Sequence, residues 1–230
     1  MTDNCYGDGC YNPPNSHVAL AYGSSPPRRD SWRLTSPNAA IAASERSSKA
    51  ATSSYMSICW QMQRSEVEIW SYCLMPNHVH IIAVPSDPDG LWRTFRRLHR
   101  DYTGFINARM RVTGHLWQGR YGLVAMDEAH LCAAFRYVAL NPVQARLTQR
   151  TQDWEWSSAR AHLTGLSNRF VRVEPALERV GDFAAFLSEP FDEAMTYAAL
   201  RKAESIGRPI GSRERLADME SRTGMALAPK

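Results

Sequence analysis

The sequence predicts an α+β protein in which an antiparallel hairpin is followed by helices. Residues 66–74 (EVEIWSYCL) and 78–85 (HVHIIAVP) are rich in β-branched and aromatic side chains, and a Met-Pro-Asn turn at 75–77 separates them. From Leu91 onward apolar residues recur at helical spacing, and a second helical stretch begins at Asp127. Locally paired strands followed by helices are typical of the α+β class.

The second strand of the hairpin presents different side chains on its two faces. Residues two apart in a strand share a face. One face is predicted to carry His78, His80, Ile82 and Val84, and the other Val79, Ile81 and Ala83. The two histidines therefore point the same way, at the start of an apolar run.

Two long helices are predicted after the hairpin. The first has an apolar stripe formed by Leu91, Phe95, Leu98, Tyr102 and Phe105. Its arginines lie mostly off that stripe, at Arg93, Arg96, Arg97 and Arg100. The second helix is acidic in its first turn, as the helix dipole favours. We expect it to end near Asn141, because Pro142 follows and the residue before a proline disfavours helical geometry.

Composition narrows the class of protein. A chain of 230 residues can bury a sizeable core, and a net charge of +4 is only mildly basic. Its five cysteines are scattered without CxxC spacing, which favours reduced thiols in a cytoplasm. No stretch approaches the roughly 20 apolar residues of a membrane span, and no charged-then-apolar leader opens the chain. We expect a soluble, cytoplasmic protein.

The histidine pair is the first candidate for chemistry. Two histidines at alternate strand positions have Cβ atoms roughly 6.5–7 Å apart, so their rings can converge on one divalent ion. His78 and His80 would supply part of a metal shell, leaving positions for water and a substrate oxygen. Two other interpretations stay open on this pair alone: a structural zinc site, or two half-exposed strand histidines.

Four motifs together carry a more specific signal. They are YCLMPNHVHIIAVP, GHLWQGRY, FRYVALNPVQARL and DWEWSSARAHL, in that order. This combination resembles the single-tyrosine transposases of the HUH endonuclease superfamily, and within it the group associated with repetitive extragenic palindromes. The resemblance runs from about Ser65 to Arg160, and more loosely to the end through GRPIGS. It implies a ferredoxin-like antiparallel sheet with helices on one face, followed by a helical C-terminal extension.

The resemblance also implies roles for individual residues. His78, Val79 and His80 match the HUH motif, whose histidines bind Mg²⁺ or Mn²⁺ in the family. Tyr137 matches the nucleophilic tyrosine, and Asn141 the polar residue that completes the metal shell. An asparagine before a proline is equally a helix-terminating device. The implied activity is cleavage and rejoining of single-stranded DNA through a 5′-phosphotyrosine, by a monomer or a homodimer that acts on a mobile element.

DNA contacts can be assigned to basic and aromatic residues. The candidate phosphate contacts are Arg93, Arg96, Arg97, Arg100 and Arg120, and the candidate stacking platform is Trp117. For any one arginine a solvated surface role is equally consistent with the sequence. We assign Trp92, Trp154 and Trp156 to the core, and Asp127 and Glu128 to a helix N-terminus rather than a catalytic carboxylate pair.

The first part of the chain, which we call the leader, differs in amino-acid composition from the rest. Residues up to about 54 are rich in Ser, Ala, Pro and Arg and have no apolar period. The resembled family begins with a strand close to HHVTQRGNRRQ. Read two bases late, the codons of residues 34–44 permit HVTQRGNRRQ, and those of 55–63 permit YVDLLADA. We hypothesise that residues from before Leu34 to about Gln63 are translated out of frame; a genuine disordered leader is the alternative.

These observations divide the chain into three regions. Residues 1–64 are a low-complexity leader, 65–165 the catalytic domain, and 166–230 the helical extension, a candidate DNA-contacting region. A sheet that lacks its first strand would expose an edge beside the histidine-bearing strand. The alternatives to an active transposase are therefore a degenerate remnant that binds DNA without cleaving it, and a metal-binding structural protein.

Overall fold

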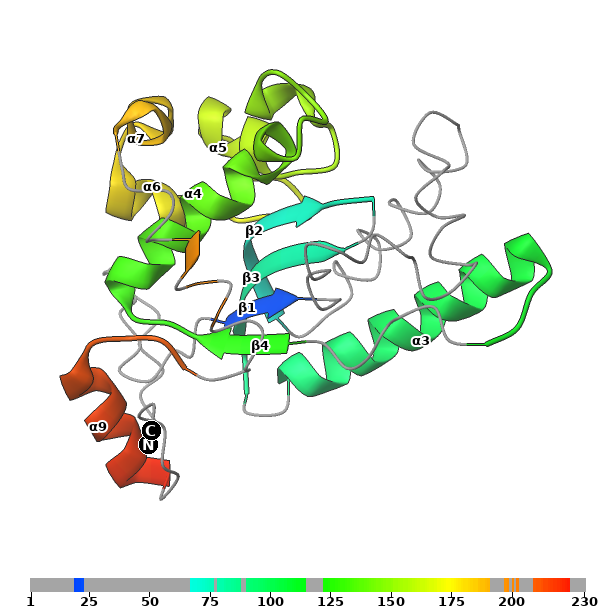
Figure 1. The fold of residues 1–230 in the computed structure, drawn as a ribbon, viewed down its shortest axis with the longest axis horizontal. Helices are drawn as coiled ribbons and strands as arrows, with labels where there is room; N and C mark the ends of the chain where they lie inside the picture. Colours follow the sequence, from blue (N-terminus) through cyan, green and yellow to red (C-terminus); the bar gives the residue numbers. More distant parts are fainter. Residues whose placement is uncertain are drawn as a thin grey trace, which may run out of the picture.

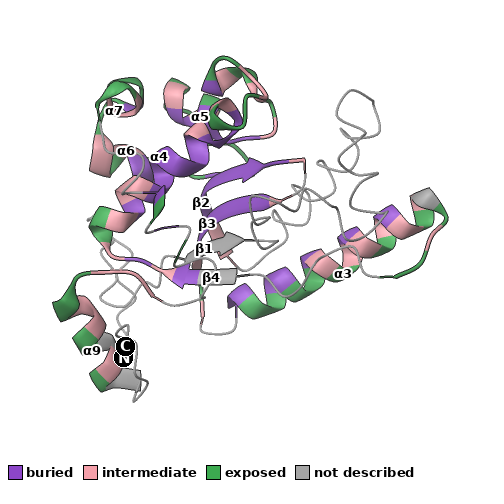
Figure 2. Cartoon of the chain, in the orientation of Figure 1, coloured by how far each residue is buried: buried purple, intermediate pink, exposed green. Residues whose placement is uncertain are grey.

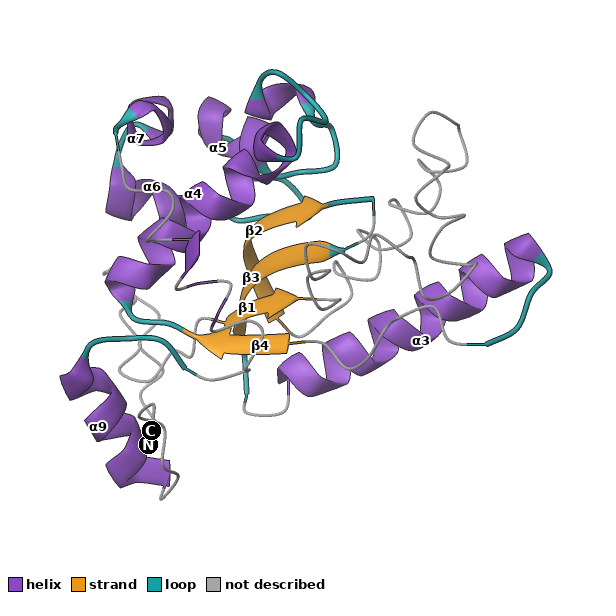
Figure 3. Cartoon of the chain, viewed as in Figure 1, coloured by secondary structure: helices purple, strands orange, loops and turns teal. Residues whose placement is uncertain are grey.

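A computed structural model describes residues 19–22, 67–76, 78–87, 90–114, 122–190, 197–198, 200, 202 and 209–223. Figure 1 shows the elements in these ranges, and Figure 3 separates helices from strands. The strands are β1 (Ala19–Tyr22), β2 (Val67–Leu74), β3 (Val79–Pro85) and β4 (Gly122–Ala125). The helices are α3 (Gly90–Met110), α4 (Glu128–Gln144), η1 (Thr151–Asp153), α5 (Ala159–Thr164), α6 (Glu174–Val180), α7 (Phe183–Ser188) and α9 (Arg213–Thr223).

The four strands form one antiparallel sheet in the order β2-β3-β1-β4. The predicted hairpin is confirmed: Val67 pairs with Pro85 and Leu74 with Val79, with an irregularity between Ile69 and Ser71. This strand order is that of a ferredoxin-like sheet, so the predicted α+β class is confirmed.

β1 corrects the expectation of a missing first strand. Ala19–Tyr22 lies between β3 and β4, and Tyr22 pairs with His80 on one side and Gly122 on the other. The strand that carries the histidines is therefore paired along both edges, and the predicted open edge is wrong. Residues 34–63, on which the out-of-frame hypothesis rests, lie outside the described residues. That hypothesis stays a prediction.

Helices cover both faces of the sheet, which corrects the prediction that they lie on one face. α3 packs on the face formed by Val79, Ile81 and Ala83. α4 packs on the opposite face, against Ile82 and Val84. Figure 1 shows α3 and α4 on either side of the sheet, and Figure 2 shows that β2, β3 and the middle of α4 are largely buried. The predicted alternation of side chains along β3 is confirmed.

α3 is the amphipathic helix that its sequence predicts, with two differences. Its buried residues are Leu91, Phe95, Leu98, Tyr102 and Ile106, together with Thr94. Phe105, predicted for the stripe, is half-buried, because the contact surface moves round the helix to Ile106 in its last turns. Trp92 is 51% exposed, so its assignment to the core is wrong. It lies one residue beyond Leu91, on the solvent side of the apolar stripe.

α4 begins where predicted and continues past its predicted end. Asp127 is its N-cap, and the carboxylate accepts hydrogen bonds from the backbone N–H of His130 and of Ser212. The helix runs through Pro142 to Gln144. Pro142 has no N–H to donate to the preceding turn, but the turn after it still closes, with Ala145 N–H donating to the Asn141 carbonyl and Leu147 N–H to that of Pro142. Asn141 is therefore a residue of the helix and does not terminate it.

The DWEWSSARAHL motif covers the edge strand β2. Leu74 N–H donates to the Trp156 carbonyl at 2.8 Å, and Ser158 N–H donates to the Tyr72 carbonyl at 2.9 Å. The His162 ring bonds the Trp70 carbonyl at 3.0 Å. These contacts occupy backbone groups that an uncovered edge would offer to another strand. Trp154 and Trp156 are half-buried against the two core clusters, close to their predicted place.

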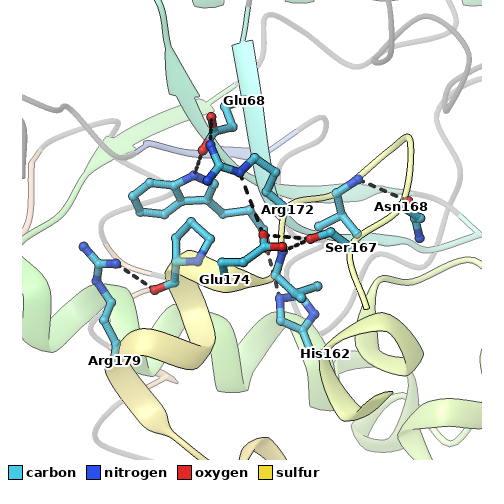
Figure 4. A network of polar contacts seen from close by, with 11 residues as sticks. Glu68, His162, Ser167, Asn168, Arg172, Glu174 and Arg179 are labelled. Atoms are coloured by element: carbon cyan, nitrogen blue, oxygen red, sulfur yellow. Dashed lines mark hydrogen bonds and ion pairs between the residues drawn. The ribbon is translucent and has the colours of Figure 1, made fainter. Parts of the chain in front are cut away.

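The chain after α5 continues along the same edge. Figure 4 shows Glu68 of β2 beside Arg172, which pairs with it at 2.8 Å, and Ser167 donating to Glu174 at 2.8 Å. Further on, Ile210 N–H donates to the Ala125 carbonyl at 2.9 Å, so the GRPIGS segment reaches the end of β4. Within the ranges described, no helix is both long and apolar enough to cross a bilayer.

Candidate active site

β3 brings the two predicted metal ligands together. The ring centroids of His78 and His80 are 4.8 Å apart, with the rings edge to face. His80 is 1% exposed and His78 is half-buried at the start of the strand. The site is therefore an inner histidine inside the fold and an outer histidine at its rim.

α4 brings the candidate nucleophile and the candidate third ligand to the same place. Tyr137 and Asn141 are four residues apart, so they share one face of the helix. The rings of Tyr137 and His80 have centroids 5.1 Å apart, and Asn141 Nδ2 lies 3.1 Å from His80 Nε2. All four residues predicted from the HUH motif and the tyrosine helix thus meet between β3 and α4.

The environment favours a neutral His78. Burial lowers the pKa of His78 well below its ordinary value of 6.5, and the neighbouring His80 lowers it further. A hydrogen bond with the Asn141 side chain acts in the opposite direction and is the smallest of the three effects. A neutral imidazole keeps a lone pair, which is the form that binds a metal.

The donor set fits an open divalent metal site better than a closed one. Within the described part of the chain, no three His, Cys, Asp or Glu side chains gather as a metal-binding group. A closed structural zinc shell takes four protein ligands, usually Cys and His. His78, His80 and the Asn141 amide oxygen offer at most three, so water or a substrate oxygen would complete the shell.

Tyr197 is a residue of the site that the sequence did not indicate. Its ring centroid lies 5.0 Å from that of Tyr137, on a segment of the C-terminal extension, and it is 2% exposed. Tyr137 contacts the rings of both His80 and Tyr197 and is 7% exposed. Tyr197 belongs to no recognised motif, and only its contact in the folded chain reveals it.

The predicted DNA contacts lie elsewhere. Arg93, Arg96, Arg97 and Arg100 are exposed on α3, which packs on the sheet face opposite His80. Three of them form ion pairs: Arg93 with Asp87, and both Arg97 and Arg100 with Asp101. Trp117 and Arg120 lie outside the described residues. The structure therefore joins the metal and nucleophile candidates and separates them from the α3 arginines.

The carboxylates at the start of α4 have structural partners. Asp127 Oδ1 lies 2.5 Å from His130 Nδ1, and the hydrogen bonds that it accepts from His130 and Ser212 outweigh burial and lower its pKa. Glu128 pairs with Arg179 at 2.7 Å. Both residues serve the helix N-terminus, in agreement with their predicted role.

One family model matches the central part of the chain. Residues 46–141 match the family described as Transposase IS200 like. Over this segment the chain is similar to the IS200-like transposases. The segment contains His78, His80, Tyr137 and Asn141, and it begins before Ser65, inside the stretch to which the out-of-frame hypothesis applies.

Two further comparisons add little to the match over residues 46–141. Among curated proteins, none matches the chain. One solved structure is similar, "Structure of the REP associates tyrosine transposase bound to a REP hairpin", with 17% identity and a TM-score of 0.48, covering 69% of this chain and 87% of the other.

Proposed function

We propose that the chain is a metal-dependent transposase that cleaves and rejoins single-stranded DNA through a 5′-phosphotyrosine. The observation that supports this most is the meeting of His78, His80, Tyr137 and Asn141 between β3 and α4. A nucleophile beside two histidine rings, of which His78 favours the neutral form, is an arrangement suited to attack on a phosphodiester.

In the cleavage step, the Tyr137 hydroxyl oxygen attacks the scissile phosphorus. The bond between that oxygen and phosphorus forms, and the bond from phosphorus to the 3′ oxygen breaks. The departing strand takes a proton and ends in a 3′-hydroxyl. A phenol has an ordinary pKa near 10, so a bound ion or a neighbouring base must favour loss of its proton.

A divalent ion, Mg²⁺ or Mn²⁺, is the proposed cofactor. His78 and His80 would hold it through ring nitrogens and Asn141 through its amide oxygen. When bound, such an ion neutralises and polarises the scissile phosphate, which otherwise repels the nucleophile. The protein contributes a neutral His78 and a helix that fixes Tyr137 beside the pair.

Rejoining is the reverse reaction on a different strand end. A 3′-hydroxyl attacks the phosphotyrosine, the new phosphodiester forms, and Tyr137 leaves and regains its proton. The covalent link conserves the energy of the broken bond, so no ATP is required. A single strand with a hairpin is the proposed substrate, because its unpaired bases are open to stacking and its stem can be bound by shape.

One observation favours a second candidate, a DNA-binding remnant that does not cleave. Tyr137 is only 7% exposed and its ring packs against that of Tyr197, so little of this side chain is open to a substrate. A remnant would bind DNA in a salt-sensitive manner and form no covalent adduct.

A denaturing gel that detects covalent protein–DNA adduct tests the proposal. The chain would be incubated with Mn²⁺ and labelled single-stranded hairpin DNA from the flanks of its own locus. We expect adduct from the intact chain, its loss in Tyr137→Phe, and its retention in Tyr102→Phe, an equally buried tyrosine on the other face of the sheet. The same gel would be run with a second chain, the restored chain, in which residues 34–63 are translated in the other reading frame.

Adduct from the restored chain alone would show that the leader disables the enzyme. No adduct from either chain, on DNA that both bind, would refute the transposase proposal in favour of the remnant.

A further inference from the structure

Trp92 is unusual on this molecule because a large aromatic ring is left open to solvent. Within the described part of the chain, only Trp92 and Leu166 are exposed large hydrophobic residues, at 51% and 70%. Trp92 lies in the first turn of α3, one residue after the buried Leu91. Exposed single apolar residues are common, so the surroundings of Trp92 decide what it means.

Those surroundings are basic. Arginines at positions 93, 96, 97 and 100 recur at intervals of three and four residues, so they form one stripe along the solvent side of α3. The guanidinium of Arg96 lies 5.0 Å from the centre of the Trp92 ring. The aromatic ring and the stripe of positive charge therefore form one continuous surface, which we call the α3 face: Trp92, Arg93, Arg96, Arg97 and Arg100.

The charge of this face is complementary to a polyanion. Within the described part of the chain, the carboxylates that pair with it are Asp87, with Arg93, and Asp101, with Arg97 and Arg100. Four arginines against two carboxylates leave an excess of positive charge. The ion pairs are solvent-exposed, and such pairs contribute little, so phosphate groups can replace the carboxylates as partners.

The aromatic ring distinguishes one kind of polyanion from another. A base within a duplex is stacked on both sides, whereas an unpaired base has a free π face that a Trp or Arg plane can cover. We propose that the α3 face docks single-stranded DNA: an unpaired base stacks on Trp92 beside Arg96, and the backbone phosphates lie along Arg93, Arg97 and Arg100. This inference rests on the proposed function, since it takes the same strand as ligand.

The α3 face and the candidate active site lie on opposite sides of the sheet. α3 packs on the sheet face opposite to the one that carries His80 and α4. DNA held on the α3 face is therefore bound across the sheet from Tyr137. Affinity for single strands and cleavage of the phosphodiester would be functions of two separate surfaces.

Fluorescence anisotropy with a labelled single-stranded oligonucleotide, and with the same sequence as a duplex, tests the inference. We expect Trp92→Ala to weaken single-strand binding roughly tenfold and Trp92→Phe to weaken it less, since a stacked base contributes on the order of 1–3 kcal/mol. Arg97→Ala should lower the slope of log K against log salt by about 0.7 for one lost phosphate contact.

The matched control lies outside both the α3 face and residues 166–230, the candidate DNA-contacting region. Arg150→Ala removes an exposed arginine that pairs with Asp153 at 4.0 Å. It should change DNA affinity by less than twofold. Thermal unfolding of each variant checks that the fold is kept, as expected for exposed positions.

Three results would overturn the inference. The first is a Trp92→Ala variant that binds single strands as tightly as Arg150→Ala does. The second is an equal loss of affinity for single strand and duplex. The third is a change of oligomeric state in Trp92→Ala, which would mean that a second copy covers the face. The adduct gel on the unmutated chain is read separately. A Trp92 effect with no adduct from either the unmutated chain or the restored chain supports the α3 face and refutes the transposase proposal. Adduct with unaltered Trp92→Ala binding refutes the α3 face alone.

Discussion

Asn141 Nδ2 lies 3.1 Å from His80 Nε2, and this contact joins α4 to the central part of the sheet. Both side chains are buried, at 8% and 1% exposed. The contact fixes the helix that carries Tyr137 one turn earlier, so a single polar bond aligns nucleophile and histidine pair. It also shows that the asparagine before Pro142 points into the site.

Asn141→Ala should lower the free energy of unfolding by about 1–2 kcal/mol, because a buried hydrogen bond is lost. Urea denaturation measures this loss, with Gln144→Ala, an exposed position at the end of the same helix, as control. The aspartate variant should bind Mn²⁺ more tightly than the unmutated chain, since a carboxylate is a stronger oxygen ligand than an amide. An alanine variant as stable as the parent would contradict the structural role of the contact.

A divalent ion should stabilise the chain through the histidine pair. At a hundredfold excess over Kd the ion contributes about 2.7 kcal/mol, which corresponds to a rise in Tm of roughly 5–10 °C. We expect this rise with Mn²⁺ and its loss on adding EDTA or in His80→Ala. His99→Ala, a half-buried histidine on α3, should keep it. An equal rise in His80→Ala would place the ion elsewhere.

Tyr197 should act on the reaction through the ring of Tyr137. Tyr197→Phe keeps the packed ring and should form adduct at nearly the parental rate. Tyr197→Ala opens a cavity, which should lower the free energy of unfolding by about 3–5 kcal/mol. It should also slow adduct formation at saturating DNA. Leu200→Ala is the matched control, since Leu200 is equally buried on the same segment. If both alanine variants slow the reaction alike at equal folded fraction, Tyr197 is only a core residue.

His162 should make stability fall in mildly acidic solution. Burial lowers its pKa below the ordinary 6.5, while its hydrogen bonds to the Ser158 and Trp70 carbonyls act in the opposite direction. Below pH 6.5 the His162 ring takes up a proton in the unfolded chain but not in the folded one. The stability that is fully present above pH 6.5 is therefore lost as the pH falls toward the lowered pKa of His162 in the folded chain.

Urea denaturation at pH 7.5 and 5.5 measures the effect, and His162→Gln should reduce the difference between the two. Because burial also lowers the pKa of His78 and His99, part of the difference should remain in that variant. Asp127 and Glu174 have lowered pKa values too, but their contribution is lost only nearer pH 4 and below. An unchanged difference in His162→Gln would contradict the assignment.

Local sequence pattern predicted much of the fold, and the failures have physical causes. The apolar run in 78–85 belongs to a strand that is buried on both faces, and the helical period of 91–106 reflects a helix that is buried on one side, so the β2-β3 hairpin and α3 followed from them. α4 is buried on most of its circumference, at successive positions from Ala134 to Ala139. Such a helix has no dominant apolar face, so periodicity could not say which side of the sheet it covers.

The residues of the candidate site that lie in recognisable motifs were predicted from the sequence. His78, His80, Tyr137 and Asn141 were assigned from a resemblance, and the structure places them together. Tyr197 and the exposure of Trp92 depend on tertiary contacts that no local pattern encodes. β1 was not predicted for a further reason. Its four residues, ALAY, are too few to show a period against a low-complexity background.

That short strand has a consequence for how the chain assembles. Among the described strands, β4 meets the sheet through β1, and β1 meets the histidine strand through Tyr22 and its neighbours. A hairpin such as β2-β3 forms between neighbours in sequence, whereas β1 must close a loop of more than forty residues to reach it. The insertion of β1 should therefore be a late folding event, one that only then locks the two halves of the sheet into one cooperative unit.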